Sequence, residues 1–166
     1  FSKIKNSPIE INLVLSSNKK ANALNYLKKK KINFKIFDFK KKNRDEKKIL
    51  DILKKKDTQL ICLAGFMKIL SRNFIKRFKG KILNIHPSLL PKYKGLNTHQ
   101  RVILNKEKFS GCTVHIVNSK LDSGKIIMQK KVRINKNDDP ESLSKKILKQ
   151  EHLLYPKALI KLLSRN

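Results

Sequence analysis

The sequence is poor in several residue types, and each shortage excludes a class of protein that depends on those residues. None of the 166 residues is Trp, and only 2 are Cys. Cys62 and Cys112 are too few for a disulfide framework, and no Cys or His spacing matches a zinc site. Both cysteines stand inside apolar blocks, so we expect buried thiols. No apolar run approaches the ~18 residues of a membrane span, and no signal peptide is visible. We therefore expect a cytoplasmic protein with no membrane partner and no metal.

Acidic residues are also few, which leaves a large excess of positive charge. The chain has 12 Asp and Glu against 41 Lys and Arg, and its formal net charge is +29. Such a charge attracts nucleic acid. Most of it is Lys, however, whereas proteins selected for bidentate phosphate or guanine contacts favour Arg. Lys, Asn and Ile are abundant together, as a codon bias toward A and T would produce. We favour codon bias and expect no specific nucleic-acid partner; a Lys-rich nucleic-acid-binding module is the alternative from a different functional class.

Short apolar blocks alternate with stretches of helical periodicity. Strands are expected at 11–16, 34–39, 59–64, 81–85, 112–117 and 126–132, and helices at 19–31, 44–56, 74–78, 98–106 and from Pro140 toward Leu163, with Pro156 as a candidate break. The alternation in the first half is typical of a Rossmann-like, mostly parallel sheet flanked by helices. The later strands have polar alternation, which favours antiparallel strands toward the C-terminus. The predicted fold class is therefore α/β.

Asn84 and His86 stand two residues apart at the end of a predicted strand, so their side chains share one face. In open α/β sheets, ligands bind beyond the carboxyl ends of the strands. Asn donates a neutral hydrogen bond, and His holds or passes a proton near neutral pH. Together they can polarise a carbonyl and stabilise the oxyanion that forms when it is attacked. The alternative, a His86 that only satisfies a rigid Pro-rich loop, is equally open at this point.

Two further segments carry candidate residues. Asp122 lies in a Gly-terminated turn after a predicted strand, where a carboxylate can fix the tautomer and the charge of a nearby imidazole. The sequence alone favours the simpler interpretation of a turn aspartate. Residues 65–71 (GFMKILS) form an apolar turn that could line a pocket for a flat ring, and core packing explains the same pattern.

Five segments resemble, in order, the motifs of the glycinamide ribonucleotide formyltransferases. They are GFMKILS (65–71), NIHPSLLPKYKGLNTH (84–99), GCTVHIV (111–117), LDSG (121–124) and QEHLLYP (150–156). The second is highly specific, and the others are weaker singly but fall in the expected order. The resemblance covers nearly the whole chain and implies the formyltransferase fold. It also implies transfer of a formyl group from 10-formyltetrahydrofolate to the amine of glycinamide ribonucleotide in de novo purine biosynthesis, without a metal.

The resemblance implies roles for individual residues by matching position. The catalytic residues would be Asn84, His86 and Asp122. The folate pocket would contain Met67, Lys68, Leu70, Val117, Asn118 and Leu121, and the nucleotide-substrate side would contain Gly65, Pro87 and Glu151. A cis peptide bond between Leu90 and Pro91 is also implied. The expected partners are these small-molecule substrates, and the expected assembly is a monomer or a homodimer.

Related activities are the alternatives. Methionyl-tRNA formyltransferase shares the catalytic trio and an SLLP loop, but it carries a further C-terminal domain. Formyltetrahydrofolate deformylase shares the fold and uses water in place of the amine, and it resembles this loop less well. A decayed, inactive homologue is a third possibility, against which the intact Asn84, His86 and Asp122 argue.

The N-terminal segment departs from the family pattern. The family normally opens with a strand and a GxGSN-type turn that binds the substrate phosphate. This chain begins with Phe1 and shows neither, so we expect residues 1–166 to be a single formyltransferase domain that lacks its first strand and phosphate-binding turn. That strand would be central in the sheet, and its loss would expose two strand edges. We therefore expect these residues alone to be poorly stable or inactive.

Overall fold

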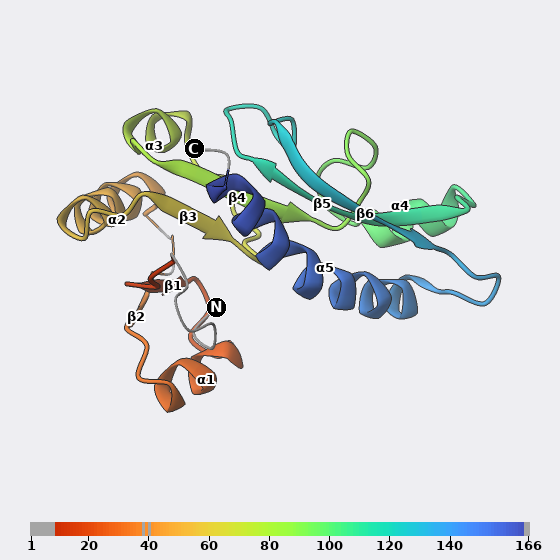
Figure 1. Ribbon diagram of the computed structural model, residues 1–166, viewed down its shortest axis with the longest axis horizontal. Coiled ribbons are helices and arrows are strands. Elements are labelled where there is room, and N and C mark those ends of the chain that lie inside the picture. Colours follow the sequence, from red (N-terminus) through yellow and green to blue (C-terminus); the bar gives the residue numbers. More distant parts are fainter. Residues whose placement is uncertain (1–8, 38, 40, 165–166) are drawn as a thin grey trace. The chain divides into compact units, whose positions relative to one another are not determined.

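The computed structural model describes residues 9–37, 39 and 41–164. The chain divides into two compact units, the first within positions 1–59 and 66–79 and the second within 60–65 and 80–166. Figure 1 labels the helices and strands of both units. The expectation of a single domain is not tested by this division and stays a prediction.

The first unit holds a short parallel sheet and three helices. Its elements are β1 (Val14–Ser16), α1 (Ala23–Lys29), β2 (Phe34–Ile36), α2 (Lys42–Lys55) and α3 (Arg72–Arg77), with β1 paired to β2. Ser71 is the N-cap of α3, since its hydroxyl accepts a hydrogen bond from the Phe74 amide at 3.0 Å. The buried carboxylate of Glu46 on α2 accepts hydrogen bonds from both the amide and the hydroxyl of Ser71. A buried polar contact therefore joins α2 to the start of α3.

The second unit is built on a four-stranded sheet in the order β3-β4-β5-β6. Its strands are β3 (Leu60–Leu63), β4 (Lys81–His86), β5 (Phe109–Ile116) and β6 (Ile126–Arg133). β3 runs parallel to β4, whereas β4, β5 and β6 are successively antiparallel. The register between β4 and β5 sets Asn84 opposite His115 and His86 opposite Thr113. This register decides which side chains meet at the carboxyl end of β4.

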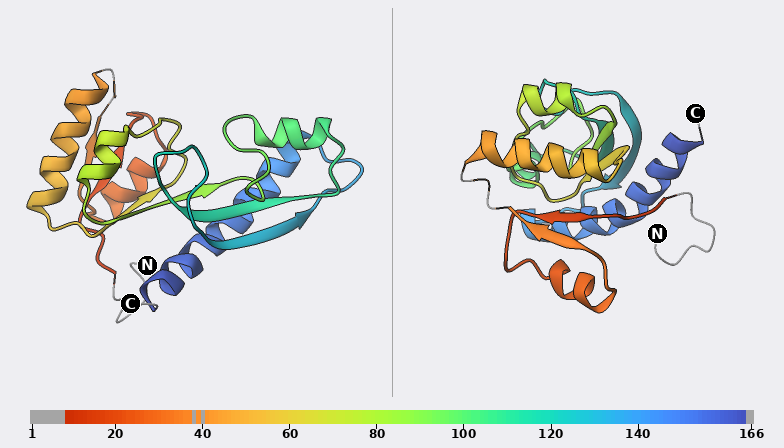
Figure 2. Two further views of the ribbon diagram at one scale, coloured as in Figure 1. Left: turned by 90° about the horizontal axis from the view of Figure 1, so that it is seen from above. Right: turned by 90° about the vertical axis from the view of Figure 1, so that its left-hand side faces the viewer.

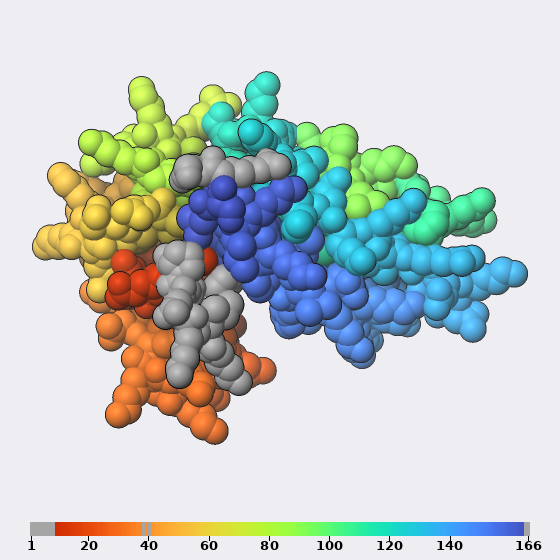
Figure 3. Space-filling model, viewed as in Figure 1, coloured from red at the N-terminus to blue at the C-terminus, as the bar shows by residue number. Residues whose placement is uncertain are grey.

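Two helices complete the second unit, α4 (Thr98–Leu104) and α5 (Pro140–Leu163). α5 begins at a capping box between Asp139 and Ser142, with Pro140 in its first turn. The helix packs along β5 and β6 (Figure 1, Figure 2). In the space-filling view its atoms form the dark blue part of the surface (Figure 3). The buried residues of α5 are Leu143, Ile147, Leu154, Ala158, Leu159 and Leu162. This apolar face forms the core of the unit together with the sheet.

Tyr155 ties α5 to the two parallel strands. Its hydroxyl oxygen lies 2.9 Å from the carbonyl oxygen of Leu63 on β3 and 3.2 Å from that of Leu83 on β4. Burial raises the pKa of this phenol above its ordinary value. Tyr155 is therefore a neutral donor with one proton, which it gives to one of the two carbonyls. The contact fixes the end of β3 beside the strand that carries Asn84.

The fold class predicted from the sequence is confirmed. Parallel strands alternate with helices, and antiparallel strands follow toward the C-terminus. The peptide bond between Leu90 and Pro91 is cis, as the resemblance implied. Several elements are shorter than expected: the predicted strand at 11–16 is reduced to Val14–Ser16, and the helix at 19–31 to Ala23–Lys29. Among the described residues, no helix has the length and the apolar character needed to cross a membrane.

Two local predictions are wrong. Cys112 is buried as expected, but Cys62 is exposed. Among the described residues β3 pairs only with β4, so it is an edge strand of its sheet and its side chains are covered incompletely. Pro156 does not break α5, which continues through it. The buried Leu154 and Leu159 on either side hold the helix together although proline supplies no amide.

Candidate active site

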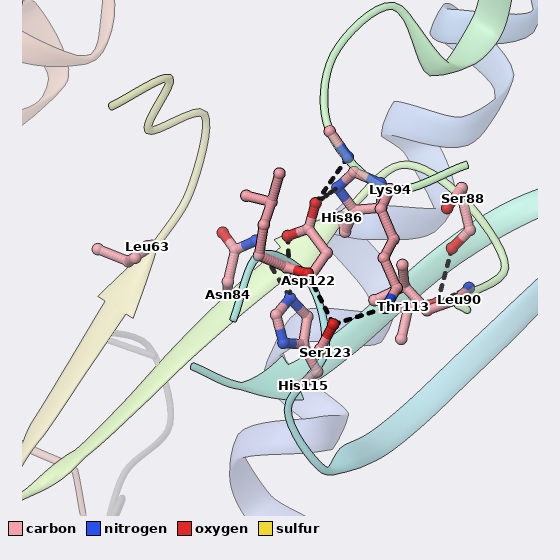
Figure 4. Close-up of polar contacts among 12 residues, drawn as sticks. Leu63, Asn84, His86, Ser88, Leu90, Lys94, Thr113, His115, Asp122 and Ser123 are labelled. Carbon is pink, nitrogen blue, oxygen red and sulfur yellow. Dashed lines mark hydrogen bonds and ion pairs between the residues drawn. The ribbon is translucent and has the colours of Figure 1, made fainter. Parts of the chain in front are cut away.

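Four polar side chains meet near the carboxyl end of β4: Asn84, His86, His115 and Asp122 (Figure 4). Asn84 and His86 occupy alternate positions of β4, so they share a face as predicted. His86 and His115 are buried, with 5% and 2% of their surface exposed. Asp122 comes from the turn that follows β5. The structure thus brings the three predicted catalytic residues together and adds a histidine that was not predicted.

Both ring nitrogens of His86 face hydrogen-bond acceptors. Nε2 lies 2.8 Å from the carbonyl oxygen of Tyr93, and Nδ1 lies 3.4 Å from Oδ2 of Asp122. Nε2 therefore carries a proton and donates it to the carbonyl, whereas Nδ1 faces the carboxylate. Hydrogen bonds of the N–H···O type are usually about 2.7–3.2 Å long. The longer distance at Nδ1 leaves that nitrogen weakly engaged, so that it could donate to a ligand oxygen whenever it carries a proton.

The turn that carries Asp122 depends on two glycines. Asp122 has a φ of 44°, and the amide of Gly95, whose φ is 80°, donates to its Oδ2 at 2.9 Å. A side chain at Gly124 would collide with the backbone, because an added Cβ would lie 1.6 Å from the carbonyl oxygen of Ile116. These constraints explain why the motif LDSG ends in glycine.

Asp122 is held as a carboxylate between two histidines. Burial by itself raises the pKa of its carboxyl group. Contacts with His115 and the Gly95 amide, together with the charge of His86, outweigh that effect, so the pKa lies below the ordinary value of 3.8. Oδ1 lies 3.6 Å from Nε2 of His115. The carboxylate is therefore ionised at neutral pH.

His115 fixes the amide of Asn84. Its Nδ1 lies 3.0 Å from the carbonyl oxygen of Ile116 and donates to it, and its Nε2 faces both Nδ2 of Asn84 at 3.3 Å and Oδ1 of Asp122 at 3.6 Å. In the tautomer in which Nε2 accepts, one N–H of the Asn84 amide is used and the other is available to a ligand. The alternation of GCTVHIV put Thr113 and His115 on one face of a strand. Only the register of β5 against β4 shows that this face meets the predicted trio.

The loop between His86 and Gly95 is held from inside by Thr113. The Thr113 hydroxyl donates to the carbonyl oxygen of Ser88 at 2.6 Å and accepts from the amide of Leu90 at 3.1 Å. Gln129 Nε2 in turn donates to Thr113 Oγ1 at 2.9 Å and to the carbonyl oxygen of Leu90 at 2.8 Å. The loop backbone is therefore pinned to the sheet on the side next to His86.

The predicted folate residues fall on both units. Met67, Lys68 and Leu70 belong to the first unit, and Val117, Asn118 and Leu121 to the second. Met67 is 76% exposed and Leu121 is 52% exposed. Each side chain therefore presents apolar surface that few other residues cover.

The predicted nucleotide-substrate residues Gly65, Pro87 and Glu151 all lie in the second unit. Gly65 stands two residues after the end of β3 and has a φ of 60°, and Pro87 directly follows His86 at the end of β4. Glu151 stands four residues before Tyr155 on α5, so both share one face of the helix. Burial raises the pKa of Glu151 from 4.5 to about 6. In the part of the chain that the structure describes, its carboxylate has no hydrogen-bond or ion-pair partner, so it can accept one from a ligand.

His99 is a second histidine that the sequence did not single out. It lies in the first turn of α4, and its buried Nδ1 has no hydrogen-bond partner among the residues that the structure describes. Burial, followed by the charge of His86, lowers the pKa of His99 below its ordinary value of 6.5. His99 is therefore a neutral imidazole within electrostatic reach of the site. Over the described residues, no three His, Cys, Asp or Glu side chains are grouped so that they could hold a metal ion.

Comparisons with known proteins agree on the family. A sequence profile of the formyl transferase family matches residues 2–159. The phosphoribosylglycinamide formyltransferase of Haemophilus influenzae is 51% identical over 106 residues, which cover 64% of this chain and 50% of that protein. The trifunctional purine biosynthetic protein adenosine-3 of Homo sapiens is 38% identical over 157 residues, which cover 93% of this chain and 16% of that protein.

Solved structures give the same result. The crystal structure of phosphoribosylglycinamide formyltransferase from Brucella melitensis has a TM-score of 0.89 and 41% identity, over 97% of this chain and 84% of that chain. Among the curated relatives, the chain spans 8% to 16% of the length of the trifunctional proteins and about half of the bacterial enzymes. The profile match over most of the chain and the shared fold lead to one conclusion: the chain belongs to the formyl transferase family.

Proposed function

We propose that the protein transfers a formyl group from 10-formyltetrahydrofolate to the amine of glycinamide ribonucleotide, a step of de novo purine biosynthesis. The relatives from Haemophilus and Brucella are named phosphoribosylglycinamide formyltransferases, which supports this choice within the family. One observation in the site carries the proposal. The Asn84 amide lies against His115 and Nδ1 of His86 faces the carboxylate of Asp122, so both side chains can present an N–H donor near the end of β4.

The two donors suit the charge that develops in formyl transfer. When the amine attacks the formyl carbon, negative charge grows on the formyl oxygen. The second N–H of Asn84 and the Nδ1–H of His86 would donate to that oxygen. Removing one donor from such a site costs about 100- to 1000-fold in rate. His115 contributes by holding the Asn84 amide in the orientation that leaves its second N–H accessible.

Asp122 would serve both charge and proton transfer. Its ionised carboxylate faces Nδ1 of His86 at 3.4 Å and would stabilise positive charge that develops there during the reaction. The attacking amine must lose a proton, and the departing folate nitrogen must gain one. A water molecule between Asp122 and the amine would carry that proton, so that no net proton is released in the transfer itself.

The remaining residues suit the two substrates by their chemistry. The exposed apolar side chains of Met67 and Leu121 fit the flat ring of a folate, together with Lys68, Leu70, Val117 and Asn118 as the other expected contacts. On the nucleotide side, Glu151 offers an unpaired carboxylate to hydroxyl or amino groups, beside Gly65 and Pro87. We also propose that residues 1–166 form one functional domain that acts in the cytoplasm as a monomer or a homodimer.

The test is an absorbance assay of formyl-folate conversion by the full-length protein. Conversion should depend on added glycinamide ribonucleotide and should fall by at least about 100-fold in His86→Ala. His152→Ala is the matched control, because His152 is exposed on α5 and lies outside the predicted site. Conversion without the nucleotide would identify a deformylase instead. No conversion by a folded, folate-binding protein would refute the proposal and favour an inactive homologue.

A further inference from the structure

Tyr93 supplies the carbonyl that accepts the Nε2 proton of His86, at 2.8 Å. The φ of Tyr93 is 56°, in the left-handed region that bulky residues rarely adopt. A change of this one residue to the ordinary conformation would turn its carbonyl away from His86. Contacts outside the backbone must therefore hold Tyr93 in place.

The side chain of Tyr93 is held by the segment that follows α4. Its Oη lies 2.9 Å from Oε1 of Glu107 and 3.1 Å from Nδ2 of Asn105. A carboxylate only accepts, so the phenol donates to Glu107 and accepts from Asn105. The guanidinium of Arg101 lies over the ring, 5.4 Å from its centroid. Tyr93 is thus held at both its ring and its hydroxyl.

Glu107 is itself fixed by the end of α4. The Lys106 amide donates to the carbonyl of Ile103 at 2.9 Å, and the Glu107 amide donates to that of Val102 at 3.3 Å. Lys106 has a φ of 50°, which ends the helix in the left-handed conformation. Val102 is buried in the core of the unit. The carboxylate of Glu107 is therefore attached to a firmly packed element.

Glu107 also pairs with Lys92, the residue directly before Tyr93. The Lys92 Nζ lies 3.0 Å from Oε1 of Glu107, and the Lys92 side chain is 67% exposed. Exposed ion pairs of this kind contribute little to stability. The hydrogen bond from Lys92, followed by that from Tyr93, lowers the pKa of the Glu107 carboxyl. Glu107 is therefore ionised at neutral pH, as its role of acceptor requires.

We propose that Glu107 is a positioning residue for the reaction: it holds the Tyr93 hydroxyl and thereby aims the Tyr93 carbonyl at Nε2 of His86. The inference rests on the proposed function only for its kinetic consequence. Glu107 would touch neither substrate, so its loss should lower kcat and leave KM nearly unchanged. The orientation of His86 is a property of the protein alone and can be measured without any substrate.

The kinetic test uses Glu107→Ala and Tyr93→Phe in the full-length protein. Each should lower kcat by about tenfold and change KM by less than about twofold, since a displacement of about 1 Å in a reacting group can cost about 100-fold. Glu107→Gln keeps an acceptor for the phenol and should recover most of the loss. The double variant should lose no more than the worse single variant, because both act on one contact. Glu141→Ala, which removes an exposed ion pair with Lys145, is the control and should leave kcat unchanged.

Nitrogen NMR of labelled histidine side chains distinguishes a changed orientation of His86 from a general loss of protein stability. The Nε2 proton of His86 should exchange slowly with water in the wild type and faster in both variants, while their unfolding temperatures match that of the control. If Glu107→Ala fails to fold, Tyr93→Phe carries the test. Unchanged proton exchange, or kcat losses that simply multiply, would overturn the proposal. A wild type that shows slow exchange but no formyl transfer would refute the proposed function and leave the role of Glu107 in the site intact.

Discussion

Glu151→Gln should make the protein more stable at neutral pH and, under the proposed function, should lower its affinity for the nucleotide substrate. Burial raises the pKa of the Glu151 carboxyl from 4.5 to about 6. The folded state therefore binds this proton more tightly than the unfolded chain does, and ionising Glu151 lowers the free energy of unfolding. Gln has nearly the same shape and no charge, so it removes that penalty.

The two pKa values set the size of the effect and its pH window. Each tenfold change in proton affinity is worth about 1.4 kcal/mol, so the rise to about 6 corresponds to about 2 kcal/mol. The side chain is only partly buried, so solvent screening reduces the expected gain to about 1 kcal/mol. Below pH 4.5 the carboxyl is protonated in both states and Gln has no advantage. The advantage grows as the pH rises from 4.5 to about 6 and is complete above that.

Urea unfolding of both proteins at about pH 4 and about pH 7.5 measures this window. The gain should appear only at the higher pH, and KM for the nucleotide should rise in the same variant. Glu141→Gln is the control, since Glu141 is exposed in the first turn of the same helix. An equal gain at both pH values would refute burial as the cause. A loss of stability at the higher pH would mean that the carboxylate has a partner inside the protein.

Three further substitutions test residues that lie in the candidate active site or support it. Asp122→Asn should lower kcat by about 100-fold or more with an unchanged circular dichroism spectrum; equal activity would refute its role. Tyr155→Phe removes the hydroxyl that contacts the carbonyls of Leu63 and Leu83, and should cost about 1–2 kcal/mol in urea unfolding. Thr113→Val removes the hydroxyl that pins the loop between His86 and Gly95; it should cost about 2–3 kcal/mol and, under the proposed function, lower kcat as well. Wild-type stability in either variant would contradict the hydrogen bonds described.

Most helices and strands could be predicted because their apolar spacing is local. Ile49, Leu50 and Leu53 follow helical spacing, and all are buried on α2. The exposure of Cys62 could not be predicted in this way. Its apolar neighbours indicate a strand, but whether a strand is central or lies at an edge depends on the partners that the rest of the chain provides.

Asn84 and His86 could be found from local sequence spacing, whereas the position of His115 depends on how two strands pair. Asn84 and His86 stand at the end of a strand, and their separation by two residues is enough to place them on one face. His115 reaches them only through the pairing of β5 with β4. A slip of one residue in that pairing would turn His115 to the other face of the sheet. The sequence does not state this register, so the residue that orients Asn84 was missed.

Backbone atoms hold the side chains that we predict to be reactive in this site. Backbone carbonyls and amides are the same in nearly every residue type, so a motif does not reveal them. The carbonyl of Tyr93 accepts from His86, the carbonyl of Ile116 accepts from His115, and the amide of Gly95 donates to the carboxylate nearby. A substitution changes such contacts only by moving the backbone. The residues that control the backbone can therefore lie outside every motif, as Glu107 does. Motifs identify the groups that react, whereas the groups that aim them are found from geometry. For this reason a change at Glu107 is expected to alter turnover while every group that touches the substrates stays the same.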